Sequence, residues 1–213
     1  MDGYEAAVVA LNEAITLDPG SWVSRSYLGA AYMKLGRPDA ALEPLLDSLD
    51  ITADEKASRN WPTVQSAETL FLLGVAHRDL ERPKQAAMAL ERGLGLDYSA
   101  SWAPDAFAML RNIYARLDRD ETLERLNQAL QGDPDDPAAY YLRGHLQAEM
   151  GLIVQAFEDF NRSWSLGSRE HELFAARGQV AQLLGRQDDA RNNFNQALKW
   201  DRQNARYHAY LAD

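Results

Sequence analysis

A small residue recurs along this chain at nearly constant spacing, and no other feature limits the possible folds as strongly. The recurring positions lie 45, 37, 33 and 34 residues apart: they are Gly29, Gly74, Arg111, Gly144 and Gly178, and the third copy has Arg in place of the small residue. A segment of this length forms one supersecondary unit that cannot bury its apolar side alone. We therefore expect similar units that stack on one another along the chain.

The residues around each recurring position predict a helix followed by a second helix. A large apolar residue stands four positions earlier in most copies, about one helical turn away, although Arg25 departs from this rule. Those residues are Leu70, Phe107, Tyr140 and Phe174. Twelve residues after each Gly comes a small residue, and four residues later a large one. The pairs are Ala41 and Leu45, Ala86 and Leu90, Ala156 and Phe160, and Ala190 and Phe194.

These pairs explain how two antiparallel helices could pack closely. A small residue lets the helix axes approach, and the large residue one turn later fills the remaining space. Turn-forming residues stand between the two predicted helices, with Gly after a helix end and Pro at a helix start. They are Gly36-Arg37-Pro38-Asp39, Glu81-Arg82-Pro83, Gly151 and Gly185-Arg186-Gln187-Asp188.

This frame resembles the tetratricopeptide repeat, whose usual period is about 34 residues. Leu28-Gly29-x-x-Tyr32 matches the pattern of the family literally, and near matches stand at Leu73-Gly74-x-x-His77 and Leu110-Arg111-x-x-Tyr114. The resemblance implies an all-α fold, a right-handed superhelical solenoid of antiparallel helix hairpins. We expect one solenoid over residues 1–213, with a partial repeat at 1–20, repeats at about 22–53, 63–98, 103–134, 137–168 and 171–203, and a partial helix at 204–213.

Two features interrupt this regular pattern. About eleven residues, 51–61, are inserted before Pro62, which we expect to open the next helix. The insertion lengthens the preceding helix, forms a loop, or does both. The chain also begins and ends inside a repeat, so we expect it to be a segment of a longer repeat protein.

Composition limits the classes of ligand. The formal net charge of −10 disfavours binding to nucleic acid and to anionic membrane surfaces. Cysteine is absent, so disulfides and thiolate chemistry are excluded. No stretch approaches the roughly 20 apolar residues that cross a bilayer, so we expect no membrane insertion. The first five residues lack the apolar core of a secretory signal, and cytoplasm and periplasm both remain open.

The sequence gives no sign of an enzyme, a metal site or a cofactor site. It contains no phosphate-binding loop, dinucleotide fingerprint, zinc-protease motif or nucleophile elbow. The histidines, His77, His145, His171 and His208, lie in different predicted hairpins, whereas a metal site needs ligands that converge. Asp133, Asp135 and Asp136 stand in a turn, where Asp is expected on structural grounds.

The resemblance implies a concave groove lined by the first helix of each hairpin. By position, the side chains that point into it include Ser26, Ala30, Met33, Ala108, Arg116, Ala148, Ala175, Gln179 and Gln182. The central hairpins supply the candidate partner-binding residues, with aromatic anchors beside hydrogen-bond donors, which is typical of binding hot spots. These are Phe71, Val75, Arg78, Asn112, Arg116, Tyr141 and His145.

Other interpretations of the groove stay open. Its donors could instead pair with nearby acids such as Glu68 and Asp79 and hold nothing. Family members that act as co-chaperones grip a C-terminal carboxylate with Lys and Asn, but Ser26 and Ala30 occupy such positions here, so that clamp is missing. The groove Asn ladder of members attached to sugar-transferring enzymes is represented only by Asn112.

We therefore expect a scaffold that binds a protein or peptide partner in its groove. An alternative is a regulatory or substrate-guiding arm of a larger enzyme or of a bacterial envelope export or assembly machine, by analogy within the family. A third interpretation is self-association through the exposed helices at the two ends of the segment.

Overall fold

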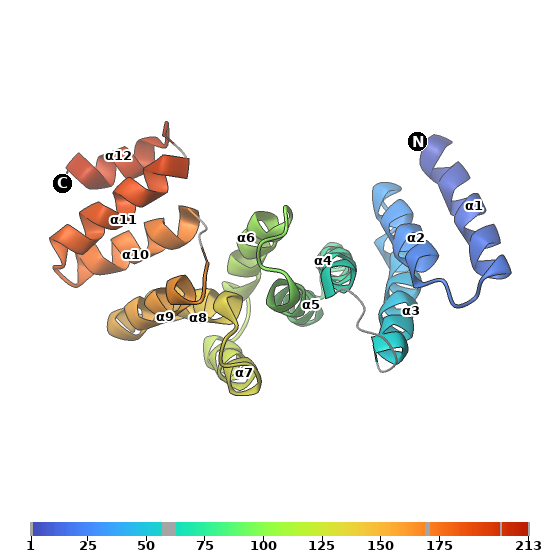
Figure 1. Cartoon of the computed structure of the whole chain (residues 1–213), viewed down its shortest axis with the longest axis horizontal. Coiled ribbons are helices and arrows are strands. Elements are labelled where there is room, and N and C mark those ends of the chain that lie inside the picture. The colour runs from blue at the N-terminus through green and yellow to red at the C-terminus, as the bar shows by residue number, and fades with distance from the viewer. Residues whose placement is uncertain (1, 57–62, 169–170, 201, 213) are drawn as a thin grey trace. The chain divides into compact units, whose positions relative to one another are not determined.

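The computed structural model describes residues 2–56, 63–168, 171–200 and 202–212, and within these ranges every regular element is an α-helix. The helices are α1 (Asp2–Leu17), α2 (Trp22–Lys34), α3 (Pro38–Lys56), α4 (Thr63–Asp79), α5 (Pro83–Leu96), α6 (Ala103–Tyr114), α7 (Arg119–Gly132), α8 (Pro137–Glu149), α9 (Ile153–Ser165), α10 (His171–Leu183), α11 (Gln187–Trp200) and α12 (Ala205–Ala212). Figure 1 shows them as successive helical hairpins. The all-α repeat fold expected from the sequence is confirmed.

The chain divides into two compact units, residues 1–116 with α1–α6 and residues 117–213 with α7–α12. The single solenoid over residues 1–213 stays a prediction. The division falls between α6 and α7, inside the hairpin in which Arg111 replaces the recurring Gly.

The recurring glycines mark the closest approach of the two helices in a hairpin. A Cβ atom added at Gly74 would lie 2.6 Å from the Cγ of Leu90, and one at Gly144 would lie 2.8 Å from the Phe160 ring. Leu90 and Phe160 are fully buried. The same contact joins Gly29 to Leu45 and Gly178 to Phe194, so the pairs predicted from the spacing do pack together.

The turns inside the hairpins use the left-handed backbone region that favours glycine. Gly36, Gly151 and Gly185 have φ values of 69°, 78° and 72°. Glu81 occupies the corresponding turn between α4 and α5 with a φ of 57°. A residue other than glycine rarely adopts this backbone conformation. Glu81 adopts it in the turn after α4, beside the depression described below.

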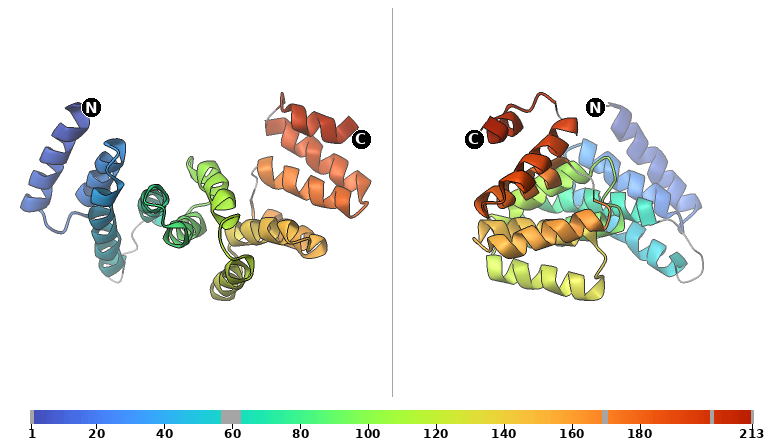
Figure 2. Two further views of the ribbon diagram at one scale, coloured as in Figure 1. Left: turned by 180° about the vertical axis from the view of Figure 1, so that it is seen from behind. Right: turned by 60° about the vertical axis from the view of Figure 1, so that its left-hand side comes forward.

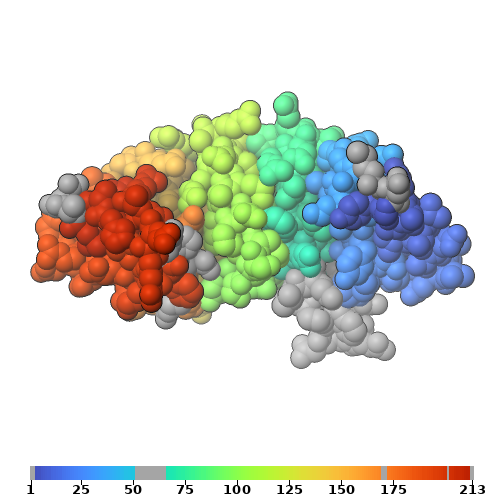
Figure 3. All heavy atoms as spheres, turned by 90° about the horizontal axis from the view of Figure 1, so that it is seen from above, coloured from blue at the N-terminus to red at the C-terminus, as the bar shows by residue number. Residues whose placement is uncertain are grey.

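In the first unit, each hairpin packs on the next in chain order (Figure 3). Leu45 and Ala41 of α3, Leu73 of α4 and Ala89 of α5 form one buried cluster between hairpins, and Met33 is among the half-buried residues packed against it. α3 continues to Lys56, so the inserted segment lengthens the preceding helix that far. Pro62 and the rest of the insertion lie outside the described residues.

In the second unit, α10, α11 and α12 lie side by side (Figure 2). Phe174, Ala175, Ala197 and Tyr207 join them in a buried cluster. The acidic turn before α8 has a structural role, because the Asp136 carboxylate accepts hydrogen bonds from the backbone N–H groups of Ala138 and Ala139. Burial raises the pKa of Asp136, although these two hydrogen bonds oppose the increase.

Arg143 joins three helices of the second unit through an ion pair and a hydrogen bond. Arg143 of α8 stands where the family pattern has Leu, and its Nε and Nη2 atoms each donate to the Asp159 carboxylate of α9 at 2.7 Å. Its Nη1 donates to the Asn127 side chain of α7 at 2.9 Å. The hydrogen bonds to Asp159 raise the pKa of Arg143 against the opposing effect of burial. A polar network therefore stands at the Leu position of the pattern, in addition to the apolar contact of Gly144 with Phe160.

Candidate partner-binding groove

Two adjoining depressions lie on the first unit, each with a volume of about 500 Å³. The first crosses α2, α4 and α6 and is lined by Ala30, Met33, Lys34, Phe71, Leu72, Val75, Arg78, Asp79, Asp105, Ala108, Met109 and Asn112. The second lies between α6 and the α4–α5 turn and is lined by Arg78, Glu81, Pro83, Met109, Asn112, Ile113 and Arg116. Because Arg78, Met109 and Asn112 belong to both, we treat the two depressions as one groove.

The apolar part of the groove has a fixed aromatic ring. Phe71 is half-buried and stacks on Trp102, with ring centroids 4.9 Å apart and planes inclined by 19°. Trp102 stands directly before α6, so the stacking joins α6 to α4. A ring held in this way loses little conformational freedom when a partner side chain packs against it.

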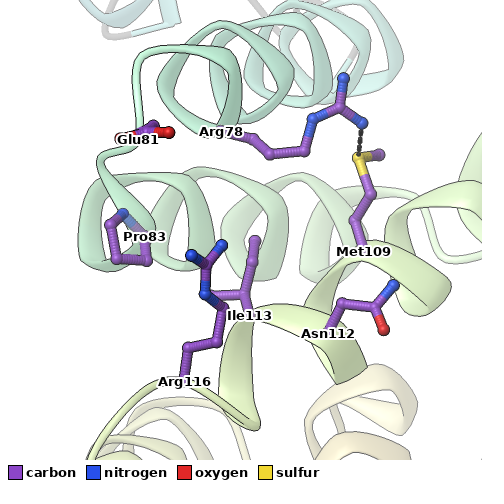
Figure 4. Close-up of a pocket in the computed structure, with 7 residues that line it drawn as sticks. All are labelled: Arg78, Glu81, Pro83, Met109, Asn112, Ile113 and Arg116. Carbon is purple, nitrogen blue, oxygen red and sulfur yellow. Dashed lines mark hydrogen bonds between the residues drawn. The ribbon is translucent and has the colours of Figure 1, made fainter.

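Arg78 divides the groove at its middle. Its Nε and Nη2 atoms donate to Asp79 Oδ1 at 2.9 and 2.7 Å, and its Nη1 donates to the Met109 sulfur at 2.9 Å (Figure 4). The alternative that Arg78 pairs with Asp79 is therefore confirmed. Both side chains are more than one-third exposed, so this pair contributes at most about 1 kcal/mol, and a thioether is a weak acceptor.

The other two donors are uncommitted. Within the described part of the chain, neither the Asn112 amide nor the Arg116 guanidinium has a hydrogen bond or an ion pair. Figure 4 shows Asn112 on α6 and Arg116 on the turn that follows α6, at separate points of the second depression. The groove thus offers unsatisfied hydrogen-bonding capacity next to apolar surface.

The structure brings five of the seven predicted residues together, namely Phe71, Val75, Arg78, Asn112 and Arg116. The family resemblance implied that the first helices line a groove, and counting from the recurring Gly positions selected these residues from α4, α6 and the turn after α6. Ala30, Met33 and Ala108 also line it, as expected from their positions.

Tyr141 and His145 belong to the second unit, and the expectation for Tyr141 is wrong. Its side chain is only 1% exposed, so it is a core residue and not an accessible anchor. It packs edge-to-face on His145, with ring centroids 4.6 Å apart, and His145 packs on Phe160 at 5.2 Å. His145 is half-buried within this aromatic cluster.

Sequence reasoning missed several residues of the groove, above all Met109, Leu72 and Lys34. Each of these follows a residue that we had predicted, such as Ala108 before Met109. The groove therefore includes side chains next to the single row of positions that we predicted on each helix. A prediction that included the neighbouring positions would have found them.

Other kinds of site find little support in the described ranges. No group of three or more His, Asp and Glu side chains there is arranged to hold a metal ion. None of the helices in those ranges combines the length and the apolar character that a membrane crossing requires.

Comparison with known proteins agrees with the architecture. The family model described as "Tetratricopeptide repeat" matches residues 67–99 and 171–204, which correspond to α4–α5 and α10–α11. Tetratricopeptide repeat protein 36 of Bos taurus is 36% identical over 86 residues, covering 38% of this chain and 46% of that protein. The Hsp70-Hsp90 organising protein of Plasmodium falciparum is 30% identical over 131 residues, covering 62% and 47%.

The chain spans about half the length of the curated relatives that it matches. Among solved structures, pilF of Pseudomonas aeruginosa has a TM-score of 0.58 and 18% identity, covering 99% of this chain and 90% of that one. Identity at this level shows a shared fold alone. The repeated Gly–large residue contacts and the helical hairpins agree with the two matches to the family model, which identify residues 67–99 and 171–204 as tetratricopeptide repeats.

Proposed function

We propose that this protein is an interaction scaffold whose first unit binds a segment of a partner protein in the groove of α2, α4 and α6. Tetratricopeptide repeats generally mediate protein–protein interaction. The observation that carries the proposal is the continuity of an apolar depression, at Phe71 and Val75, with the uncommitted donors Asn112 and Arg116.

The side chains of this groove are already positioned for binding. The backbone that carries these side chains is already ordered. The loss of conformational entropy on binding therefore comes mainly from the partner segment. Burial of apolar surface supplies affinity at roughly 25 cal/mol per Å², and the free donors would be satisfied by polar groups of the partner.

The test is a selection of random twelve-residue peptides on the full chain, followed by titration of the selected peptides. Phe71→Ala should weaken them by at least about 1 kcal/mol, roughly fivefold in Kd. Asn112→Ala changes an exposed groove residue and should also weaken binding without a change in thermal unfolding.

The matched control is Met88→Ala. Met88 is 53% exposed on α5 and does not line the groove, so its replacement should leave the affinity unchanged. Selected peptides that bind all of these variants equally well, or a selection that enriches no peptide, would contradict the groove assignment.

The second interpretation, an arm of a larger enzyme or export machine, gains no separate support from the described residues. It stays a prediction that a neighbouring catalytic or envelope domain in the full reading frame would favour.

A further inference from the structure

The two halves of the groove differ in the chemistry that they offer. The first half is floored by Met33, Leu72 and Val75, and the second carries the guanidinium groups of Arg78 and Arg116. We infer that the partner segment carries an acidic side chain close in sequence to a large apolar one, with the carboxylate held between Arg116, Asn112 and Arg78. This inference rests on the proposed function.

The groove has hydrogen-bond donors that a partner could use. Arg116 and Asn112 have no partner in the described part of the chain, and the Nη1 atom of Arg78 is engaged only by the Met109 sulfur. A carboxylate accepts hydrogen bonds from charged donors far more strongly than a thioether does. A carboxylate of the partner would therefore replace Met109 as the acceptor for Arg78 and also accept from Asn112 and Arg116.

The competing acids leave some of these donors available. Asp79 occupies the Nε and Nη2 atoms of Arg78 and leaves Nη1 available. Asp105 lines only the first half of the groove, and Glu81 lines the second but forms no ion pair with Arg116 in the described residues. The second half thus presents two guanidinium groups and one carboxylate, in a chain whose net charge is −10.

The apolar side chain would enter the first half of the groove. Met33 and Met109 are unbranched and adaptable, so the first half should accept several large apolar residues and not select one shape. Since Arg78, Met109 and Asn112 line both halves, the two side chains of the partner must enter neighbouring spaces on the same side of its backbone. In an extended segment, residues two positions apart meet this requirement.

The experiment uses the same selected peptides, synthesised with amidated C-termini so that no terminal carboxylate is present. Each acidic peptide is compared with its Glu→Gln or Asp→Asn analogue, against the full chain and against Arg116→Gln. We expect the enriched sequences to pair an acidic residue with a large apolar one. Arg116→Gln should weaken the acidic peptide about tenfold, as loss of a charge-assisted hydrogen bond requires. Binding of the amide analogue should change little.

Arg92→Gln is the matched control, because Arg92 is an exposed residue of α5 that does not line the groove. Enriched peptides without acidic residues would overturn the inference, as would equal losses for the acidic and amide peptides or an equal effect of Arg92→Gln. If those peptides still lose affinity with Phe71→Ala, the proposed function survives and only the partner chemistry fails. Insensitivity to every groove substitution would overturn both.

Discussion

At the scale of single residues, the recurring glycines are required by space. A helix interior normally favours Ala over Gly by up to about 1 kcal/mol, yet this chain keeps Gly at four equivalent positions. The reason is the large side chain of the second helix, which occupies the space that a Cβ atom would need.

Gly144→Ala should therefore destabilise the second unit by roughly 1–3 kcal/mol, because its Cβ would lie 2.8 Å from the Phe160 ring. Gly132→Ala is the control within the same unit, since nothing lies within 4 Å of the added Cβ there. That change should be neutral or stabilising, and thermal unfolding followed by circular dichroism compares the two. Equal effects would show that close approach is not the constraint.

His77 gives the first unit a dependence on pH. Burial, aided by the charge of Arg82, lowers its pKa below the ordinary value of 6.5. The unfolded chain then binds a proton more readily than the folded one, so stability rises with pH and is lost as the pH falls from about 6.5 through the folded pKa.

His77→Tyr should reduce this dependence, since Tyr32 and Tyr114 occupy the corresponding positions of neighbouring hairpins. Urea unfolding at pH 7.5 and pH 5.5 measures the free energy of unfolding for both proteins. The difference between the two pH values should be smaller in the variant, and an unchanged difference would assign the effect to other groups.

At the scale of the elements, the contact between α8 and α9 combines the apolar packing of Gly144 and Phe160 with an ion pair. Arg143 and Asp159 are mostly buried, and removal of one partner leaves the other charge without compensation. The pair fixes which faces of the two helices meet, because both donors of Arg143 require one orientation of the carboxylate.

Asp159→Asn should cost about 2–4 kcal/mol of stability, and Asp135→Asn is the matched control. Asp135 also pairs with an arginine, Arg162, at 2.8 Å, but its side chain is 74% exposed and its loss should cost less than about 1 kcal/mol. Urea unfolding of both variants distinguishes the two cases. A small loss for both would mean that water reaches the Arg143 site.

At the scale of the whole molecule, α1 corresponds to the second helix of a hairpin, and its apolar side chains are incompletely buried. Ala41 and Leu45 are completely buried, whereas the corresponding Ala7 and Leu11 are partly exposed, and Val9 is 61% exposed. Apolar surface of this kind favours association.

Self-association therefore stays a prediction with a direct measurement. Light scattering across a hundredfold range of protein concentration should show a rising mass, and Val9→Glu should lower it by placing a charge on that surface. A constant monomeric mass for the unaltered chain would contradict the expectation.

The helical hairpins could be predicted from the amino-acid sequence alone. Helix positions and the Gly–large residue contacts follow from local periodicity, because the spacing of residues fixes which face of a helix each side chain occupies. The candidate groove residues also required the resemblance to a known repeat family, which implied that the first helices line a groove. The turn residues then set where each helix ends.

Which helix faces remain exposed depends on how the hairpins pack against one another. Tyr141 has the same periodicity as Phe71, but α9 and α10 supply Phe160 and Glu172 around it, and its side chain is enclosed. Packing likewise brings Arg78 to the Met109 sulfur and Arg143 to Asp159. The division after Arg116 is also a property of the packed chain. Exposure and pairing depend on neighbours distant in sequence, whose positions no local spacing specifies.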